Sequence, residues 1–176
     1  MDLLDFDPEE LYFEQPDADI VQQLLQQAGS AYEKGDAELL LLKAFMRAPK
    51  SLNVLVALNR FYYYQHRLEE ALLISEKALV IIGTKLPFPF PAYWQDIKPG
   101  DISRVPKELL SWVRLYLFTL KSIGFLKMRL LQLDESKAIF EKLVTLDREN
   151  RIGGVGLLEI VTRKIEENNH VFRLHQ

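Results

Sequence analysis

The sequence predicts an all-α protein whose helices form antiparallel pairs and stack as a solenoid. One observation is an internal period, because Ala37 and Ala44 recur 34 residues later as Ala71 and Ala78. Another is the stretch 52–83, in which two apolar patterns of helical spacing are joined by a tight turn. A fixed period of roughly 20–50 residues is typical of solenoids, in which each repeat packs on its neighbours.

Composition restricts the classes of protein to consider. A chain of 176 residues is long enough for one domain that buries roughly 70% of its unfolded surface. Cysteine is absent, which excludes disulfides, thiolate chemistry and cysteine-based zinc sites and fits the cytoplasmic location that we expect. The N-terminus lacks a basic region, so we expect no signal peptide. Four cations interrupt the apolar stretch 109–131, which we interpret as a buried amphipathic helix and not a membrane span.

Charge is unevenly distributed along the chain. The first 19 residues carry eight acids and no base. The other 17 acids face 22 bases, so the remainder has a formal charge of +5. Residues 1–16 are interpreted as an acidic N-terminal tail with two alternatives. They form a mobile tail with one helical turn, or they dock as a peptide-like segment on a basic apolar surface of the protein or of a partner.

Two helical pairs are predicted before residue 84. Asp17 is the expected N-cap of a first helix that ends near residue 34. Gly35 ends that helix and Asp36 caps the next, which covers 37–48. Ser51 is the expected N-cap of a third helix over 52–65. A fourth helix covers 68–82, after a turn at Arg67. Small side chains at four positions allow the paired backbones to approach closely: Ala37, Ala44, Ala71 and Ala78.

These residues resemble tetratricopeptide repeats. Residues 18–51 and 52–83 are similar to two consecutive repeats, and residues 117–150 are similar to a third with an extended first helix. The resemblance implies a right-handed superhelical solenoid with a C-terminal capping helix. Three positions depart from the family pattern: Asn59 and His66, where small residues are usual, and Arg148, where proline is usual.

The segment 84–106 interrupts the period with five of the eight prolines. Proline breaks helices, so no long helix is expected to cross it. Its aromatic residues are Phe88, Phe90, Tyr93 and Trp94. We consider two roles for this insert: a plug whose aromatic side chains cover an exposed helix face, or a polyproline-like element that contacts a partner. Helical patterns resume over 106–131 and 134–146. A capping helix is expected over 151–167, at the end of a single domain that covers residues 17–167. Residues 168–176 are expected to form a frayed C-terminal tail outside this domain.

No motif for catalysis, metal or nucleotide binding is present in the sequence. The three histidines have no metal-ligand spacing, and Gly153, Gly154 and Gly156 lack the strand, helix and lysine of a phosphate loop. Adjacent carboxylates fit solvated helix faces. The pI near 5.7 and the lack of a dense basic stripe disfavour nucleic-acid binding. We expect no enzyme activity and no cofactor.

The resemblance implies a concave groove lined by the first helix of each pair. Its groove-facing residues would be Asn53, Val56, Arg60, Tyr63, Tyr64, Phe118, Lys121, Phe125 and Arg129, with Asp19, Gln22, Gln26 and Met128 beside them. Aromatic and cationic side chains favour a ligand with apolar anchors and acidic groups. The alternative for Phe118 and Phe125 is packing against the insert. The family's carboxylate clamp is not matched at Gln22, Gln26, Val56 and Arg60.

We therefore expect a cytoplasmic, bacterial-type, non-enzymatic module that binds a peptide or helix of a protein partner. One alternative is a chaperone similar to those of type III secretion translocators. Another is a structural scaffold that self-associates. We also hypothesise that residues 2–14 can occupy the groove of the same or a neighbouring molecule, which would be a route to self-association.

Overall fold

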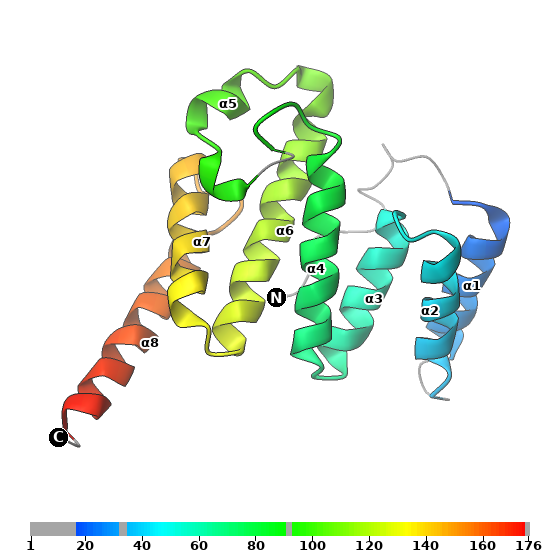
Figure 1. Cartoon of the computed structure of the whole chain (residues 1–176), viewed down its shortest axis with the longest axis horizontal. Helices are drawn as coiled ribbons and strands as arrows, with labels where there is room; N and C mark the ends of the chain where they lie inside the picture. The colour runs from blue at the N-terminus through cyan, green and yellow to red at the C-terminus, as the bar shows by residue number, and fades with distance from the viewer. Residues whose placement is uncertain (1–16, 32–34, 91–92, 175–176) are drawn as a thin grey trace. The chain divides into compact units, whose positions relative to one another are not determined.

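The computed structural model describes residues 17–31, 35–90 and 93–174, the last six of these by their backbone alone. The described residues form eight α-helices and two short 3₁₀-helices and contain no β-strand, which confirms the predicted all-α class (Figure 1). The helices are α1 (Asp19–Ser30), α2 (Ala37–Arg47), α3 (Leu52–Tyr64), α4 (Leu68–Gly83), α5 (Pro99–Ser103), α6 (Leu110–Arg129), α7 (Leu133–Leu146) and α8 (Val155–Leu174). The chain divides into two compact units between Ile81 and Ile82, near the end of α4.

The first unit contains two helical pairs. Helix α1 lies beside α2, and α2 packs on α3 (Figure 1). Ala37, Ala44, Ala71 and Ala78 are almost completely buried. Their short side chains allow close approach of the helix backbones, as the sequence pattern predicted.

The N-caps of the first unit agree only in part with the sequence. Ser51 caps α3 as expected, because its hydroxyl oxygen accepts a hydrogen bond from the Val54 amide at 3.2 Å. The prediction for Asp17 was wrong. Helix α1 starts after Ala18, without a side-chain cap, and the Asp17 carboxylate instead accepts hydrogen bonds from Ser51 and Asn53. Asp36 precedes α2 as predicted but also forms no side-chain cap.

Helices α3 and α4 are joined through a buried amide. The Asn59 Nδ2 atom donates to the Ala71 carbonyl at 2.9 Å and to the Ser75 hydroxyl at 2.7 Å. The turn that follows α3 places His66 in the left-handed region with φ +57°, and the Arg67 amide donates to the Tyr62 carbonyl. This hydrogen-bond pattern is a Schellman motif, which normally favours glycine at the left-handed position.

An ion-pair network links α2 to the start of α4. The Arg67 guanidinium lies 2.8 Å from carboxylate oxygens of both Glu38 and Glu70. Its hydrogen bond holds the pKa of Glu70 below the usual value. The same guanidinium carbon lies 4.6 Å from the ring centre of Tyr62. Arg67 therefore does more than mark the turn, since it also connects two helical pairs.

The second unit is built around α6 and α7. Phe140 is completely buried, and the Ser136 hydroxyl donates to the Gly124 carbonyl at 2.7 Å. Helix α6 ends in the same type of turn as α3, with Leu131 at φ +62° and the Gln132 amide donating to the Lys127 carbonyl. The two turns therefore share one geometry.

The proline-rich insert is part of the second unit. Its apolar side chains Leu86, Phe90 and Ile97 are buried, and the ring of Phe90 meets that of Tyr116 edge-on at 5.3 Å. These contacts are those expected of a plug. Two other aromatic side chains of the insert lie at the surface: Phe88 is 83% exposed and Tyr93 is 72% exposed.

The C-terminal helix differs from the prediction in both of its ends. Helix α8 begins at Val155, four residues later than expected, and its backbone stays helical to Leu174, through most of the expected frayed tail. The helix starts later because Gly153 has a φ of +79°, in the left-handed region, which a right-handed helix cannot include. Gly154 then fits closely on α7, since a Cβ atom there would lie 3.3 Å from Leu143.

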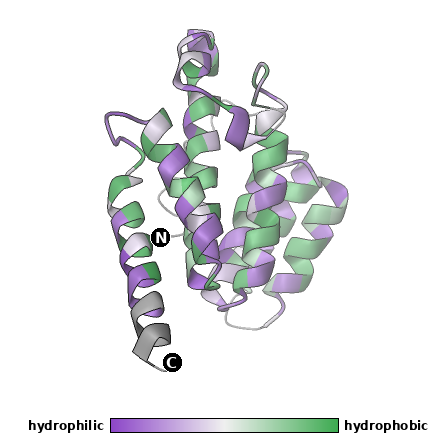
Figure 2. Ribbon diagram, turned by 60° about the vertical axis from the view of Figure 1, so that its left-hand side comes forward, coloured by the Kyte–Doolittle hydropathy of each residue, from purple (hydrophilic) through white to green (hydrophobic). Residues whose placement is uncertain are grey.

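One described segment is long and apolar enough to cross a membrane by length and composition, Lys107–Arg129. In the most apolar 18-residue stretch of this segment, 61% is buried inside the structure. A buried core helix can be equally long and apolar. Helix α6, which makes up most of this segment, is such a core helix of the second unit. Apolar and polar residues recur along the helical ribbons in the amphipathic pattern expected of packed helices (Figure 2).

Candidate functional site

Two hollows adjoin on the face that α1 and α3 form in the first unit. One has a volume of about 490 Å³ and the other of about 350 Å³. Both are lined by Leu25, Ala57 and Arg60, so we treat them as one groove and name it the α1/α3 groove. Its other lining residues are Asp17, Gln22, Ala28, Gly29, Leu41, Asn53, Val56 and Tyr64.

Helix α3 supplies the groove residues through its regular spacing. Residues three and four apart lie on one face of a helix, and Asn53, Val56, Arg60 and Tyr64 follow that spacing. The Ser51 cap sets the start of the helix, and the Asn59 amide, which lines neither hollow, holds the helix against α4. The groove face is therefore positioned by side chains that do not line it.

The electrostatics of the groove depend on Arg60. The acidic residue in its lining is Asp17, whose carboxylate accepts hydrogen bonds from Ser51 at 2.8 Å and Asn53 at 3.0 Å. Within the described ranges no carboxylate forms an ion pair with the Arg60 guanidinium. Val56 is buried and lines the same hollow as Arg60. The groove thus combines an apolar floor with one cation that is available to an acidic ligand.

The predicted tyrosine pair has two different environments. The rings of Tyr63 and Tyr64 meet edge-on, with their centres 5.6 Å apart. Tyr64 is 53% exposed and lines the groove, whereas Tyr63 is half-buried and does not line either hollow. Tyr64 is therefore the better candidate for contact with a ligand.

The predicted residues of α6 belong to the second unit, where Lys121 differs from the expectation. Its side chain is only 5% exposed, and its Nζ atom donates to the Ile152 carbonyl at 2.9 Å. It also lies 4.9 Å from the ring centre of Phe118. Lys121 is a buried contact to the segment before α8, so the prediction of an open groove cation at this position was wrong.

The other α6 residues are more accessible than Lys121. Phe118 and Phe125 are half-buried, and Arg129 is exposed. The Arg114 guanidinium lies 5.5 Å from the ring centre of Phe118. The ring of Phe118 therefore has two cations within cation–π distance, Arg114 and Lys121.

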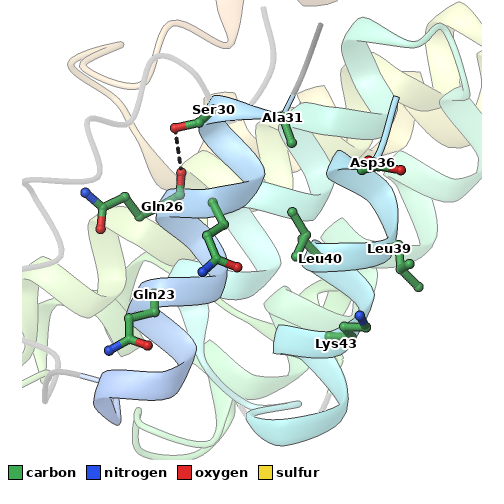
Figure 3. Close-up of a pocket in the computed structure, with 9 residues that line it drawn as sticks. Gln23, Gln26, Ser30, Ala31, Asp36, Leu39, Leu40 and Lys43 are labelled. Carbon is green, nitrogen blue, oxygen red and sulfur yellow. Dashed lines mark hydrogen bonds between the residues drawn. The ribbon is translucent and has the colours of Figure 1, made fainter. Parts of the chain in front are cut away.

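A further hollow of about 690 Å³ lies between α1 and α2 (Figure 3). Gln23 and Gln26 line it from α1, and Leu40 and Lys43 line it from α2. The expectation that Gln26 faces the concave groove was therefore wrong. The sequence reasoning also missed Leu25 and Ala57 as groove residues, since an apolar residue in a helical stripe gives no sign of whether it lies in the core or lines a groove.

The described residues contain no group of three or more His, Asp or Glu side chains that could hold a metal ion. The lining of the α1/α3 groove offers apolar contact, the Arg60 guanidinium, the Asp17 carboxylate, and amide and hydroxyl groups.

Comparison with known proteins identifies a relative along nearly the whole chain. No protein-family model matches, and no solved structure matches significantly. A protein of Azotobacter chroococcum mcd 1, described as an uncharacterized 19.8 kDa protein in the nifW 5′ region, is 40% identical over 167 residues. The chain belongs to the same family as this Azotobacter protein. The match covers 95% of this chain and 92% of the relative, so the relationship extends over both units.

Proposed function

We propose that this protein is a non-enzymatic interaction module of the tetratricopeptide type, which binds a peptide or helix of a protein partner in the cytoplasm. Helical pairs with small residues at their contacts support the repeat architecture. The Schellman turns at His66 and Leu131 support it too, because they follow the first helix of two predicted repeats and share one hydrogen-bond pattern.

The α1/α3 groove is the observation that carries the proposal. It is lined by the first helices of two consecutive pairs, which is where the proposed architecture places its ligand. Arg and Tyr are enriched among residues that dominate binding energy, and Arg60 and Tyr64 both line the groove. The preferred ligand therefore has apolar side chains for the floor and an acidic group for Arg60.

The name of the relative provides a first partner to test. That protein is described by its place in the 5′ region of nifW. We therefore include the nifW product as a candidate partner.

The experiment is affinity purification of the tagged protein from its own cells, compared with an Arg60→Glu/Tyr64→Ala variant. We expect wild type to capture a partner that this variant loses. Charge reversal at Arg60 and removal of the Tyr64 ring change the groove but leave the α3–α4 contact intact. Arg47→Glu on the exposed end of α2 is the matched control and should retain the partner. Circular dichroism should show unchanged helix content in all three proteins. A partner retained by the groove variant would contradict the proposal.

A second candidate, the self-associating scaffold, is favoured by exposed apolar side chains on α2. Leu39, Leu42 and Met46 follow helical spacing, and Met46 is 82% exposed. Contiguous exposed apolar residues are typical of protein contact surfaces. Light scattering after size exclusion should show a mass that rises with concentration and falls in a Leu39→Lys/Met46→Glu variant. A monomeric wild-type protein at all concentrations would contradict this function.

A further inference from the structure

The described chain begins at the α1/α3 groove. Asp17 is its first residue, and the Asp17 carboxylate lines one end of the groove and binds Ser51 and Asn53. The sixteen residues that precede Asp17 in the sequence are therefore attached at this end.

The chemistry of that preceding segment complements the groove. Residues 2–14 read DLLDFDPEELYFE, with acidic and apolar side chains and no base. The groove has an apolar floor at Leu25 and Val56, and Arg60 forms no ion pair with a carboxylate of the described residues. This acidic, apolar segment has the properties that we deduced above for the groove ligand.

The segment also has sufficient length. From Asn53 to Tyr64 the α3 axis covers about 16 Å at 1.5 Å per residue. An extended chain covers this distance with about five residues, since each contributes roughly 3.3 Å. Residues 2–14 therefore exceed the length that the groove requires.

We propose that residues 2–14 occupy the α1/α3 groove of their own chain and compete with the protein partner. The proposal rests on the function proposed above and specifies how that site is regulated. An acidic side chain of the segment pairs with Arg60, and its apolar side chains cover Val56 and Leu25. The partner must displace the segment in order to bind.

Mass action gives the expected size of the competition. A short tether produces an effective concentration of roughly 1 mM, so a segment with an intrinsic dissociation constant of about 100 µM occupies about nine in ten grooves. A competing peptide then binds about ten-fold more weakly than to an empty groove.

The test uses a fluorescent synthetic peptide of residues 2–14 and the full-length protein, with binding measured by fluorescence anisotropy. The wild-type chain is compared with a Phe6→Ser/Leu11→Ser/Phe13→Ser variant, whose substitutions all precede the described helices. We expect the peptide to bind this variant about ten-fold more tightly than it binds wild type. Adding Arg60→Glu to the variant should abolish binding, and adding Arg47→Glu should not. A peptide of the same composition in scrambled order is the probe control.

Three outcomes would overturn the proposal. They are equal binding of the peptide to wild type and variant, no binding to either, and wild-type dimers that the triple substitution converts to monomers. The last result would place the segment in the groove of a second copy. The purification with Arg60→Glu/Tyr64→Ala tests the groove separately: a partner lost there despite a failed peptide test leaves the proposed function standing and removes only this inference.

Discussion

Gly124 and Phe140 are in such close contact that a Cβ atom on Gly124 would lie 2.8 Å from Cε1 of the Phe140 ring. Helix α6 therefore approaches α7 where a side chain is absent, and the ring fills the space. In the first unit Asn59 and Ser75 occupy the corresponding positions of α3 and α4, joined by a hydrogen bond of 2.7 Å. The same helix-pair contact is thus made by glycine and a large ring in one pair and by two polar side chains in the other.

Gly124→Ala should destabilise the protein. The higher helix propensity of alanine contributes about 1 kcal/mol of stability. Overpacking a core typically costs about 1–3 kcal/mol, and here the neighbouring Phe140 and Ile139 side chains are both buried. We expect a net loss of about 1 kcal/mol in chemical denaturation.

The control for Gly124→Ala is Gly156→Ala in α8, where a Cβ atom would meet no atom within 4 Å. This substitution should stabilise the protein by a few tenths of a kcal/mol or more, up to about 1 kcal/mol. Combining Gly124→Ala with Phe140→Leu should recover part of the combined loss of the single substitutions. If the free-energy losses of the two single substitutions simply add in the double variant, the Gly124–Phe140 contact does not limit the packing of α6 on α7.

His66→Gly and Leu131→Gly should each stabilise the protein. Both residues have a positive φ and exposed side chains, so glycine removes a strain of about 1–2 kcal/mol without loss of packing. The greater freedom of glycine in the unfolded chain offsets roughly 0.5–1 kcal/mol. The expected net gain is about 0.5–1 kcal/mol, measured by thermal or urea unfolding. Gln65→Gly, at φ −81°, is the matched control and should destabilise.

Lys142→Met should loosen the insert without affecting the helices. The Lys142 Nζ atom donates to the carbonyls of Gln95 at 2.7 Å and Ile97 at 2.9 Å. Hydrogen bonds from charged groups contribute about 1.5–3 kcal/mol, and the methionine stem preserves the apolar contacts. Hydrogen exchange of the Asp96 and Ile97 amides should become faster. Lys137→Met removes only a surface ion pair with Glu141 and should leave this exchange unchanged.

Stability at high pH should depend on Tyr116. Burial raises the pKa of its hydroxyl from 10.0 to about 12. Between these values the unfolded chain has lost a proton that the folded chain keeps, so stability is complete below pH 10 and falls as the pH rises towards 12. Tyr116→Phe should reduce that fall by up to about 2 kcal/mol in urea unfolding at matched ionic strength. An identical pH profile of both proteins would contradict the prediction. The exposed Tyr93→Phe serves as the control.

Much of the helical organisation could be predicted because it depends on local patterns. The Ser51 cap, the ends of α2 and α7, and the small residues between the paired helices follow from spacing within a few residues. The N-cap role of Asp17 was predicted from the same local rules and was wrong, because Ser51 and Asn53, distant in sequence, take its carboxylate. A local rule fails where a long-range partner competes for the same group.

The candidate site was predicted in part. Asn53, Val56, Arg60 and Tyr64 were all expected in the groove and do line one hollow or the other in the first unit. Lys121 has the same kind of position in its helix as these residues, yet its ammonium group is buried against the Ile152 carbonyl. Helical spacing assigns a residue to a face, but the neighbouring segment decides whether that face is open.

The sequence by itself determined the all-α class, the helix pairs and the small residues at their contacts, because helix formation and amphipathicity depend on residues three and four apart. Only the tertiary structure decided that Gln26 lines the α1/α2 hollow, that Leu25 lines the α1/α3 groove, and that Phe90 of the insert packs on Tyr116. Such contacts join side chains that are far apart in the sequence. They depend on the rotation of each helix against its neighbours, which packing sets and local periodicity does not encode.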